Sequence, residues 1–211
     1  MIHTVRGTFT GAVALAVLLT ACAGSARETS ASDGALAQAL APGFARVVVV
    51  RHAEKAPTPA NDPVLSAIGI ARATALDSAV RDYGITDVVV SHLQRTRLTA
   101  AAVIARVSPT LHVVPIGGGG VAAHARAVAD TVRAIAQRPR HGGVLVVGHS
   151  NTVTPIVEAL GGGTLRELCD SQYSQFFEVQ LVVSGPSRLR RVTYGAADPV
   201  DATCAGMAAP R

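Results

Sequence analysis

The sequence predicts a three-layer α/β/α domain built on a mostly parallel sheet. Residues Val47–Val50 and Val144–Val147 are continuous apolar runs without polar alternation, which is typical of strands buried on both faces. Segments with helical character separate the expected strands, and this alternation favours parallel strands covered by helices on both sides. Residues 45–211 are long enough to bury one hydrophobic core, so we expect a single domain.

The elements between the two runs follow from turn and cap residues. Three prolines between residues 57 and 63 exclude a regular helix before Ser66. Ser66 is a good N-cap for a helix that reaches about Tyr83, and Gly84 suits the position after its end. The remaining expected elements, in order, are a strand at 87–90, a helix at 96–107, a strand at 111–115, a Gly-rich turn at 117–120, a helix at 122–137, a strand at 144–147, a helix starting at 154, and strands at 176–183 and 189–194.

The first residues of the chain have the organisation of an export signal. Arg6 precedes an apolar stretch at 11–19 that is too short for a comfortable membrane span. We therefore expect residues 1–21 to be a signal peptide. Leu19-Thr20-Ala21-Cys22 resembles a bacterial lipobox, so Cys22 is expected to carry lipid and residues 22–44 to be a tether. The alternative is an ordinary cleavage site with an incidental cysteine.

These segments predict a location in the bacterial cell envelope. Lipid on Cys22 would hold the protein on the periplasmic side of a membrane. Ala23 rather than Asp follows that cysteine, which by resemblance to known sorting rules favours the outer over the inner membrane. In an oxidising compartment Cys169 and Cys204 are then left as a candidate disulfide pair, the alternative being two unpaired thiols.

The net charge of +5 does not by itself indicate nucleic-acid binding. The arginines are scattered along the chain, and the chain holds only three Tyr and four Phe residues to stack on bases. An ordinary basic surface in the cell envelope fits better, with no nucleic-acid partner.

Charged and polar residues follow three of the expected strands. Arg51-His52-Ala53-Glu54-Lys55 follows the first, Ser91-His92-Leu93-Gln94-Arg95 the second, and Gly148-His149-Ser150-Asn151 the third. Because parallel sheets collect ligands at the carboxyl ends of their strands, we expect these residues to form one basic site.

Four blocks of the sequence make residues 45–183 resemble the histidine phosphatase superfamily, which has the phosphoglycerate-mutase-like fold. They are Arg51-His52, Leu65-Ser66-Ala67-Ile68-Gly69, Ser91 to Thr96 with Thr99-Ala100, and Gly148-His149-Ser150. The resemblance implies that His52 takes the phosphoryl group and that water then attacks the phosphohistidine. It also implies that His149 donates to the phosphoryl group during transfer.

Arginine chemistry agrees with this implication. The planar guanidinium groups of Arg51 and Arg95 match phosphoryl oxygens and would favour the free base of a nearby histidine. Ser150 and Asn151, at the expected start of a helix, are candidate substrate-binding residues, and Arg97 and His92 are weaker candidates. A zinc ligand role for His149 is disfavoured because no cluster of further ligands surrounds it, so no metal and no cofactor are expected.

The acid that would protonate the leaving group is the weak point of the resemblance. Family members place a Glu or Asp after the third strand or an Asp after the second His, whereas this chain has Ile116-Gly117-Gly118-Gly119-Gly120-Val121 and Ser150 at those places. Glu54 is the nearest carboxylate in sequence and Asp62 is the other possibility. The Arg-His-Ala-Glu-Lys sequence also resembles that of the small phosphohistidine phosphatases and the exported lipopolysaccharide-heptose phosphatases.

The sequence therefore predicts an exported, metal-independent phosphatase that hydrolyses a small phosphomonoester through phospho-His52. The alternatives are a phosphohistidine phosphatase, whose substrate has a good leaving group, and a catalytically weak phospholigand-binding lipoprotein. No obligate protein partner is inferred. Export disfavours a glycolytic mutase, and the short domain disfavours a phytase-like enzyme.

Overall fold

The sheet is the central layer of the fold. The computed structural model describes residues 1, 3, 41–201 and 204, so the predicted signal peptide, Cys22 and most of the tether lie outside the described residues. Six strands are arranged in the order β3-β2-β4-β1-β5-β6. Strands β1 to β4 are mutually parallel, whereas β5 runs antiparallel to both β1 and β6. The predicted α/β class with a mostly parallel sheet is confirmed.

The elements follow the predicted order closely. Ser66 caps the first helix, with its Oγ accepting from the Gly69 N–H, and Gly84 adopts the left-handed conformation after the short 3₁₀ turn. The bounds are β1 Phe44–Arg51, α2 Ala67–Ala79, η1 Arg81–Tyr83, β2 Ile85–Val90, α3 Gln94–Thr99, α4 Ala101–Val107, β3 Thr110–Val113, α5 Gly120–Ala136, β4 Gly143–Gly148, α6 Ser150–Ala159, β5 Gln175–Val182 and β6 Arg188–Thr193.

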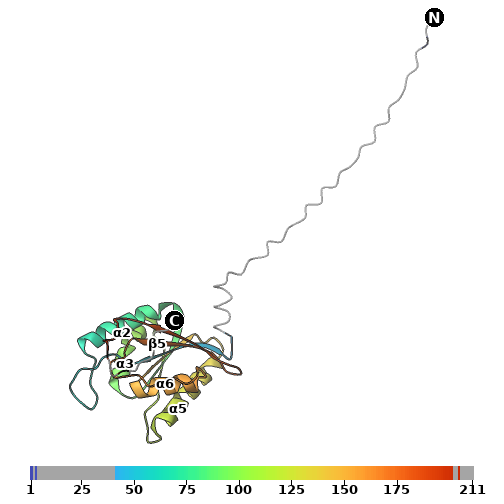
Figure 1. Cartoon of the computed structure of the whole chain (residues 1–211). Coiled ribbons are helices and arrows are strands. Elements are labelled where there is room, and N and C mark those ends of the chain that lie inside the picture. The colour runs from blue at the N-terminus through green and yellow to red at the C-terminus, as the bar shows by residue number, and fades with distance from the viewer. Residues whose placement is uncertain (2, 4–40, 202–203, 205–211) are drawn as a thin grey trace.

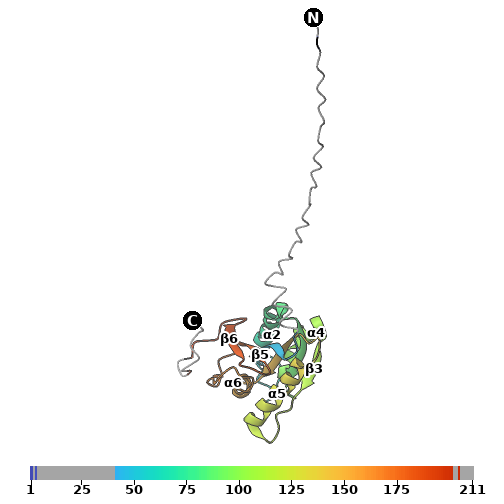
Figure 2. The same cartoon turned by 90° about the vertical axis from the view of Figure 1, so that its right-hand side faces the viewer.

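The core is divided into two parts by the sheet. Val47 and Val49 are buried among residues of α5 and α6, whereas Val48 and Val50 are buried among residues of α2 and α4. Figures 1 and 2 show α2 with α3 and α4 on one face of the sheet and α5 with α6 on the other. A strand without a polar side chain is therefore required here, because each face of β1 meets a layer of helices.

Two helices differ from the expectation. The helix expected at 96–107 is interrupted at Ala100, and the hydroxyl of Thr99 donates to the Arg95 carbonyl while accepting from the Ala53 N–H. Threonine bonds of this kind bend helices. Helix α6 begins at Ser150 rather than near residue 154, because the Thr152 hydroxyl accepts from the His149 N–H and stabilises an earlier first turn, which leaves Pro155 inside the helix.

Two glycines of the sequence blocks are explained by close approach. A Cβ atom on Gly69 would lie 2.1 Å from the backbone oxygen of Glu54, so this glycine allows α2 to contact the segment after β1. A Cβ atom on Gly148 would lie 2.9 Å from the Thr152 hydroxyl and would obstruct the start of α6. In the described part of the chain, no helix combines the length and apolar character that crossing a membrane requires.

Candidate active site

The carboxyl ends of β1 and β4 bring two histidines together. The two strands pair in parallel with Arg51 opposite Gly148, and the His52 N–H donates to the Gly148 carbonyl. His52 and His149 therefore leave the sheet side by side, with ring centroids 5.1 Å apart in an edge-to-face arrangement. Both side chains are about 5 % exposed.

The hydrogen bonds of His52 fix which nitrogen is free. Its Nδ1 lies 2.8 Å from the carbonyl oxygen of Ala53. Since a carbonyl only accepts, Nδ1 carries the proton in the neutral ring and Nε2 keeps the lone pair. Burial lowers the pKa of His52 to about 4, and the positive charges of Arg51 and Arg95 act in the same direction. His52 is therefore an uncharged base with a free Nε2 at neutral pH.

His149 is held by a serine from the neighbouring strand end. Its Nε2 lies 3.0 Å from the Oγ of Ser91, and that oxygen also lies 3.2 Å from the hydroxyl of Thr96. Burial, with smaller contributions from His52 and Arg95, lowers the pKa of His149 to about 3. The hydroxyl network thus orients a neutral imidazole beside His52.

The two predicted arginines act electrostatically on this pair of histidines, because each lowers the pKa of both rings. Burial lowers the pKa of each guanidinium. The Nε–H groups of Arg51 and Arg95 are buried and have no hydrogen-bond partner among the described residues. A buried donor without an acceptor is costly, and a phosphoryl oxygen is an acceptor that both groups could share.

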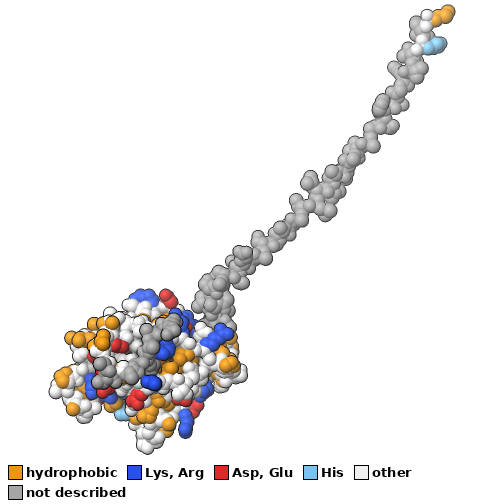
Figure 3. All heavy atoms as spheres, in the orientation of Figure 1, with side chains coloured by type: hydrophobic (Ala, Val, Ile, Leu, Met, Phe, Trp, Pro, Cys, Tyr) orange, Lys and Arg blue, Asp and Glu red, His pale blue; other side chains and the backbone are white. Residues whose placement is uncertain are grey.

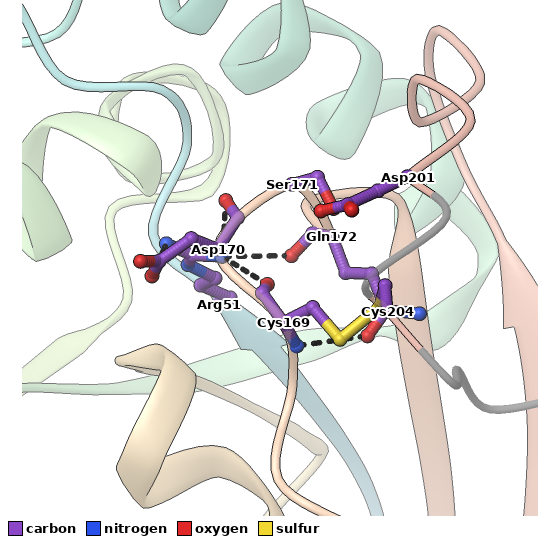
Figure 4. Close-up of a disulfide and its surroundings, with 7 residues drawn as sticks. All are labelled: Arg51, Cys169, Asp170, Ser171, Gln172, Asp201 and Cys204. Carbon is purple, nitrogen blue, oxygen red and sulfur yellow. Dashed lines mark hydrogen bonds and ion pairs between the residues drawn. A yellow bond between two sulfur atoms is a disulfide. The ribbon is translucent and has the colours of Figure 1, made fainter.

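Arg51 is fixed by a loop near the C-terminus. Its Nη1 donates to the carbonyl oxygens of Cys169, Asp170 and Gln172 over 2.9, 3.0 and 3.1 Å. Figure 4 shows this guanidinium against the loop that the Cys169–Cys204 disulfide closes. The Cα atoms of these two cysteines, which the sequence left as a candidate pair, are 5.9 Å apart.

Segments beyond β6 support the same loop. The carboxylate of Asp198 accepts from the backbone N–H groups of Tyr173 and Ser174, both over 2.8 Å. The hydroxyl of Ser171 bonds to Asp201 over 3.0 Å. The disulfide and these hydrogen bonds therefore position the carbonyl groups that hold Arg51.

Glu54 does not stand free beside the histidines. Its carboxylate receives the guanidinium of Arg72, with Nε 2.9 and 3.0 Å from its two oxygens and Nη2 2.8 Å from the first. Arg72 also donates to the carbonyls of Tyr194 and Ala196. This geometry gives Glu54 a structural partner and does not support the predicted role of proton donor.

The other predicted residues lie around the site. Asp62 accepts from the backbone N–H of Gln94 and lies 3.8 Å from the Nη1 of Arg95. Ser150 and Asn151 form the first turn of α6 next to His149. Arg97 and His92 are exposed, and the Nδ1 of His92 accepts from the Ile116 N–H.

Two side chains near the histidines were not identified from the sequence. The guanidinium carbon of Arg51 lies 3.9 Å from the ring centroid of Tyr173, and the Tyr173 hydroxyl lies 3.2 Å from Nη2 of that arginine. His124 on α5 is buried and lowers the pKa of His149. For Tyr173 the available signal was a tyrosine two residues before a strand in a chain with few aromatic residues. The sequence around His124 gave no such signal.

The charge distribution and ligand sets restrict the chemistry further. Among the described residues, no group of three or more His, Cys, Asp and Glu side chains could hold a metal ion. On the face that Figure 3 shows, Lys and Arg side chains are dispersed among acidic and uncharged ones. The site itself combines two neutral histidines with two arginines, a set suited to moving a phosphoryl group to a nitrogen nucleophile.

Comparison with known sequences gives one family match. The family model for the histidine phosphatase superfamily (branch 1) matches residues 47–116, which include His52 and Arg95. No curated protein sequence matches the chain.

Solved structures share the fold at low sequence identity. The protein histidine phosphatase SixA in complex with tungstate is 22% identical with a TM-score of 0.52, over 70% of this chain and 96% of that one. The α-ribazole phosphatase from Shigella flexneri is 17% identical with a TM-score of 0.52, over 74% and 99%. The mycobacterial glucosyl-3-phosphoglycerate phosphatase is 18% identical with a TM-score of 0.51, over 72% and 99%.

Proposed function

We propose that the chain is a member of the histidine phosphatase superfamily, whose model matches residues 47–116, and that it is a metal-independent phosphatase that hydrolyses phosphomonoesters through a phosphohistidine on His52. The observation that carries this proposal is a neutral His52 with a free Nε2, close to two arginines whose Nε–H groups have no acceptor among the described residues. Nε2 attacks phosphorus while Arg51 and Arg95 bind the equatorial oxygens, whose charge they neutralise during transfer. Water then cleaves the N–P bond and releases phosphate.

His149 and its serine serve the same step. In this proposal Ser91 holds the ring so that its other nitrogen faces the phosphoryl group, and Ser150 and Asn151 add donors at the start of α6. Removing one such contact from a phosphoryl transition state commonly lowers kcat by about 100-fold or more.

Turnover of an aryl phosphate and trapping of the intermediate test the mechanism. The purified full chain is expected to hydrolyse the ester in the presence of EDTA and to carry an acid-labile phosphoryl label after rapid quenching. His52→Ala is expected to lose both the label and the turnover. His112→Gln is the control, since that histidine lies on β3 and pairs with Asp87. An undiminished rate in His52→Ala would disprove the mechanism.

A second candidate function is dephosphorylation of phosphohistidine. Glu54, the acid nearest His52 in sequence, is bound by Arg72, and an imidazole leaving group needs little help from an acid. Rates on a phosphohistidine peptide and on an alkyl phosphate separate the two candidates. A labelled protein that stops after one equivalent on every substrate would instead indicate a phospholigand-binding protein.

We also propose that the protein is exported and held on the periplasmic side of the envelope by lipid on Cys22. The Cys169–Cys204 disulfide supports an oxidising compartment. Cells expressing the full chain are expected to show the protein in the membrane fraction, with the outer membrane favoured on a density gradient. Cys22→Ala is expected to release it to the soluble fraction, and unchanged fractionation would contradict lipidation.

A further inference from the structure

Tyr173 lies against both residues that would contact the phosphoryl group. Its ring centroid is 6.3 Å from that of His52, edge to face, and 3.9 Å from the guanidinium carbon of Arg51. The side chain is partly exposed, so it is accessible to a substrate bound at His52. No motif of the sequence assigns a role to this tyrosine.

Backbone hydrogen bonds fix the position of Tyr173 in its loop. Its N–H donates to the Asp198 carboxylate, and the next residue, Ser174, bonds to that carboxylate through both its N–H and its hydroxyl. The Cys169–Cys204 disulfide closes the other end of the loop. A phenol held in this way is preorganised, as a proton donor in an active site must be.

Three carboxylates that border the site are each engaged by an arginine. A carboxylate whose oxygens pair with a guanidinium is directed toward that group and is not free to face a leaving group. The three pairs are Glu54 with Arg72 at 2.8 Å, Asp170 with Arg51 at 3.6 Å and Asp62 with Arg95 at 3.8 Å. A fourth carboxylate, that of Asp198, accepts from the backbone N–H groups of Tyr173 and Ser174.

The third histidine is also unsuited to donate. The Nδ1 of His124 lies 3.2 Å from the carbonyl oxygen of Pro115, so its proton is held there. Burial lowers the pKa of His124, and the ring is uncharged at neutral pH. Its Nε2 therefore carries a lone pair and no proton.

The hydroxyl of Tyr173 has the proton that these groups lack. Arg51 only donates, so the Tyr173 oxygen accepts from Nη2 over 3.2 Å and keeps its own hydrogen for another acceptor. Nη2 of Arg51 would remain hydrogen-bonded to that oxygen after the proton has been transferred. We propose that Tyr173 is the general acid that protonates the leaving oxygen, an inference that rests on the proposed phosphatase function.

The proton balance closes over one turnover. In the first step the bond from His52 Nε2 to phosphorus forms, the bond from phosphorus to the ester oxygen breaks, and that oxygen takes the proton of Tyr173. In the second step water attacks phosphorus, the N–P bond breaks, and the phenolate takes a proton from the water. Tyr173 and His52 then regain their starting states, with alcohol and phosphate as products.

The test is the substitution Tyr173→Phe, which keeps the ring on Arg51 and removes only the hydroxyl. A good leaving group departs without a proton, whereas an alkoxide requires one. The variant is expected to lose about 100-fold or more of kcat on an alkyl phosphate, and to stay within about threefold of wild type on an aryl phosphate. The change in the alkyl-to-aryl rate ratio is the readout, since a structural defect would lower both rates together.

Tyr83→Phe is the matched control, because it removes a hydroxyl that bonds to Glu178 away from the site. Equal losses on both esters in Tyr173→Phe, or an unchanged ratio, would overturn the assignment of the acid while leaving the phosphatase intact. Wild-type protein that hydrolyses only the aryl ester would also overturn it, since no acid would then be in use. Absence of turnover on both esters in wild type would instead refute the proposed function itself.

Discussion

His52 is expected to stay active well below the pH at which an ordinary histidine loses its lone pair. An exposed imidazole has a pKa of 6.5, and burial beside the arginines lowers that of His52 to about 4. At pH 5.5 about 97 % of His52 is then the free base, against about 9 % for an unperturbed ring. Lowering the pH from 7.5 to 5.5 should therefore leave the nucleophile almost fully available, where an ordinary histidine would lose about tenfold.

Two assays separate the ionisation of His52 from that of the substrate. Nitrogen-detected NMR titration reports the protonation of each ring directly, and the His52 signals are assigned by their absence in His52→Asn. Single-turnover phosphorylation over the same pH range reports the nucleophile, with the substrate's own second ionisation measured separately and corrected. A midpoint near 6.5 for the His52 ring would refute the reasoning, because burial and positive charge would then not control its protonation.

Three further outcomes follow from the structure. Replacing Cys169 and Cys204 by serine opens a loop with a sequence separation of 35 residues and should lower the free energy of unfolding by about 3–4 kcal/mol. The kcat/KM should also fall about tenfold, because the carbonyl groups that accept from Arg51 lose their fixed positions. A fully retained kcat/KM in the double serine variant would contradict this link. Glu54→Gln should lower the free energy of unfolding by about 1–3 kcal/mol, since Arg72 loses a charged partner. At temperatures below the unfolding transition, the variant should hydrolyse aryl and alkyl phosphates at the wild-type rates. A selective loss of alkyl phosphate turnover would instead identify Glu54 as the acid. Lowering the pH from 7 to 5 should lower the free energy of unfolding by about 2 kcal/mol for each of His52 and His149. Their pKa values in the folded protein lie below the unfolded value, so the unfolded chain binds more protons over this range. Urea titrations that give the same stability at both pH values would count against these shifts.

The strand ends were predictable because their signals are local. Four valines before Arg51-His52 and the apolar run before Gly148-His149 each identify a buried strand and its carboxyl end. Parallel strands in one sheet bring these ends to the same edge, and the structure pairs the two strands directly. Helix α6 begins at Ser150, earlier than residue 154, because the Thr152 hydroxyl accepts from the His149 N–H and stabilises an earlier first turn.

The sequence alone thus determined the fold class and the order of the strand ends, and it identified His52, His149, Arg51 and Arg95 as candidate site residues, since each inference depends on neighbours along the chain. Only the tertiary structure decided the pairings between distant residues. It joined Glu54 to Arg72 and placed the loop at Cys169–Tyr173 on Arg51. These contacts depend on which surfaces meet once the sheet and helices have packed. The residue types alone could therefore not distinguish a free carboxylate from one held by an arginine, or place the phenol of Tyr173 against Arg51.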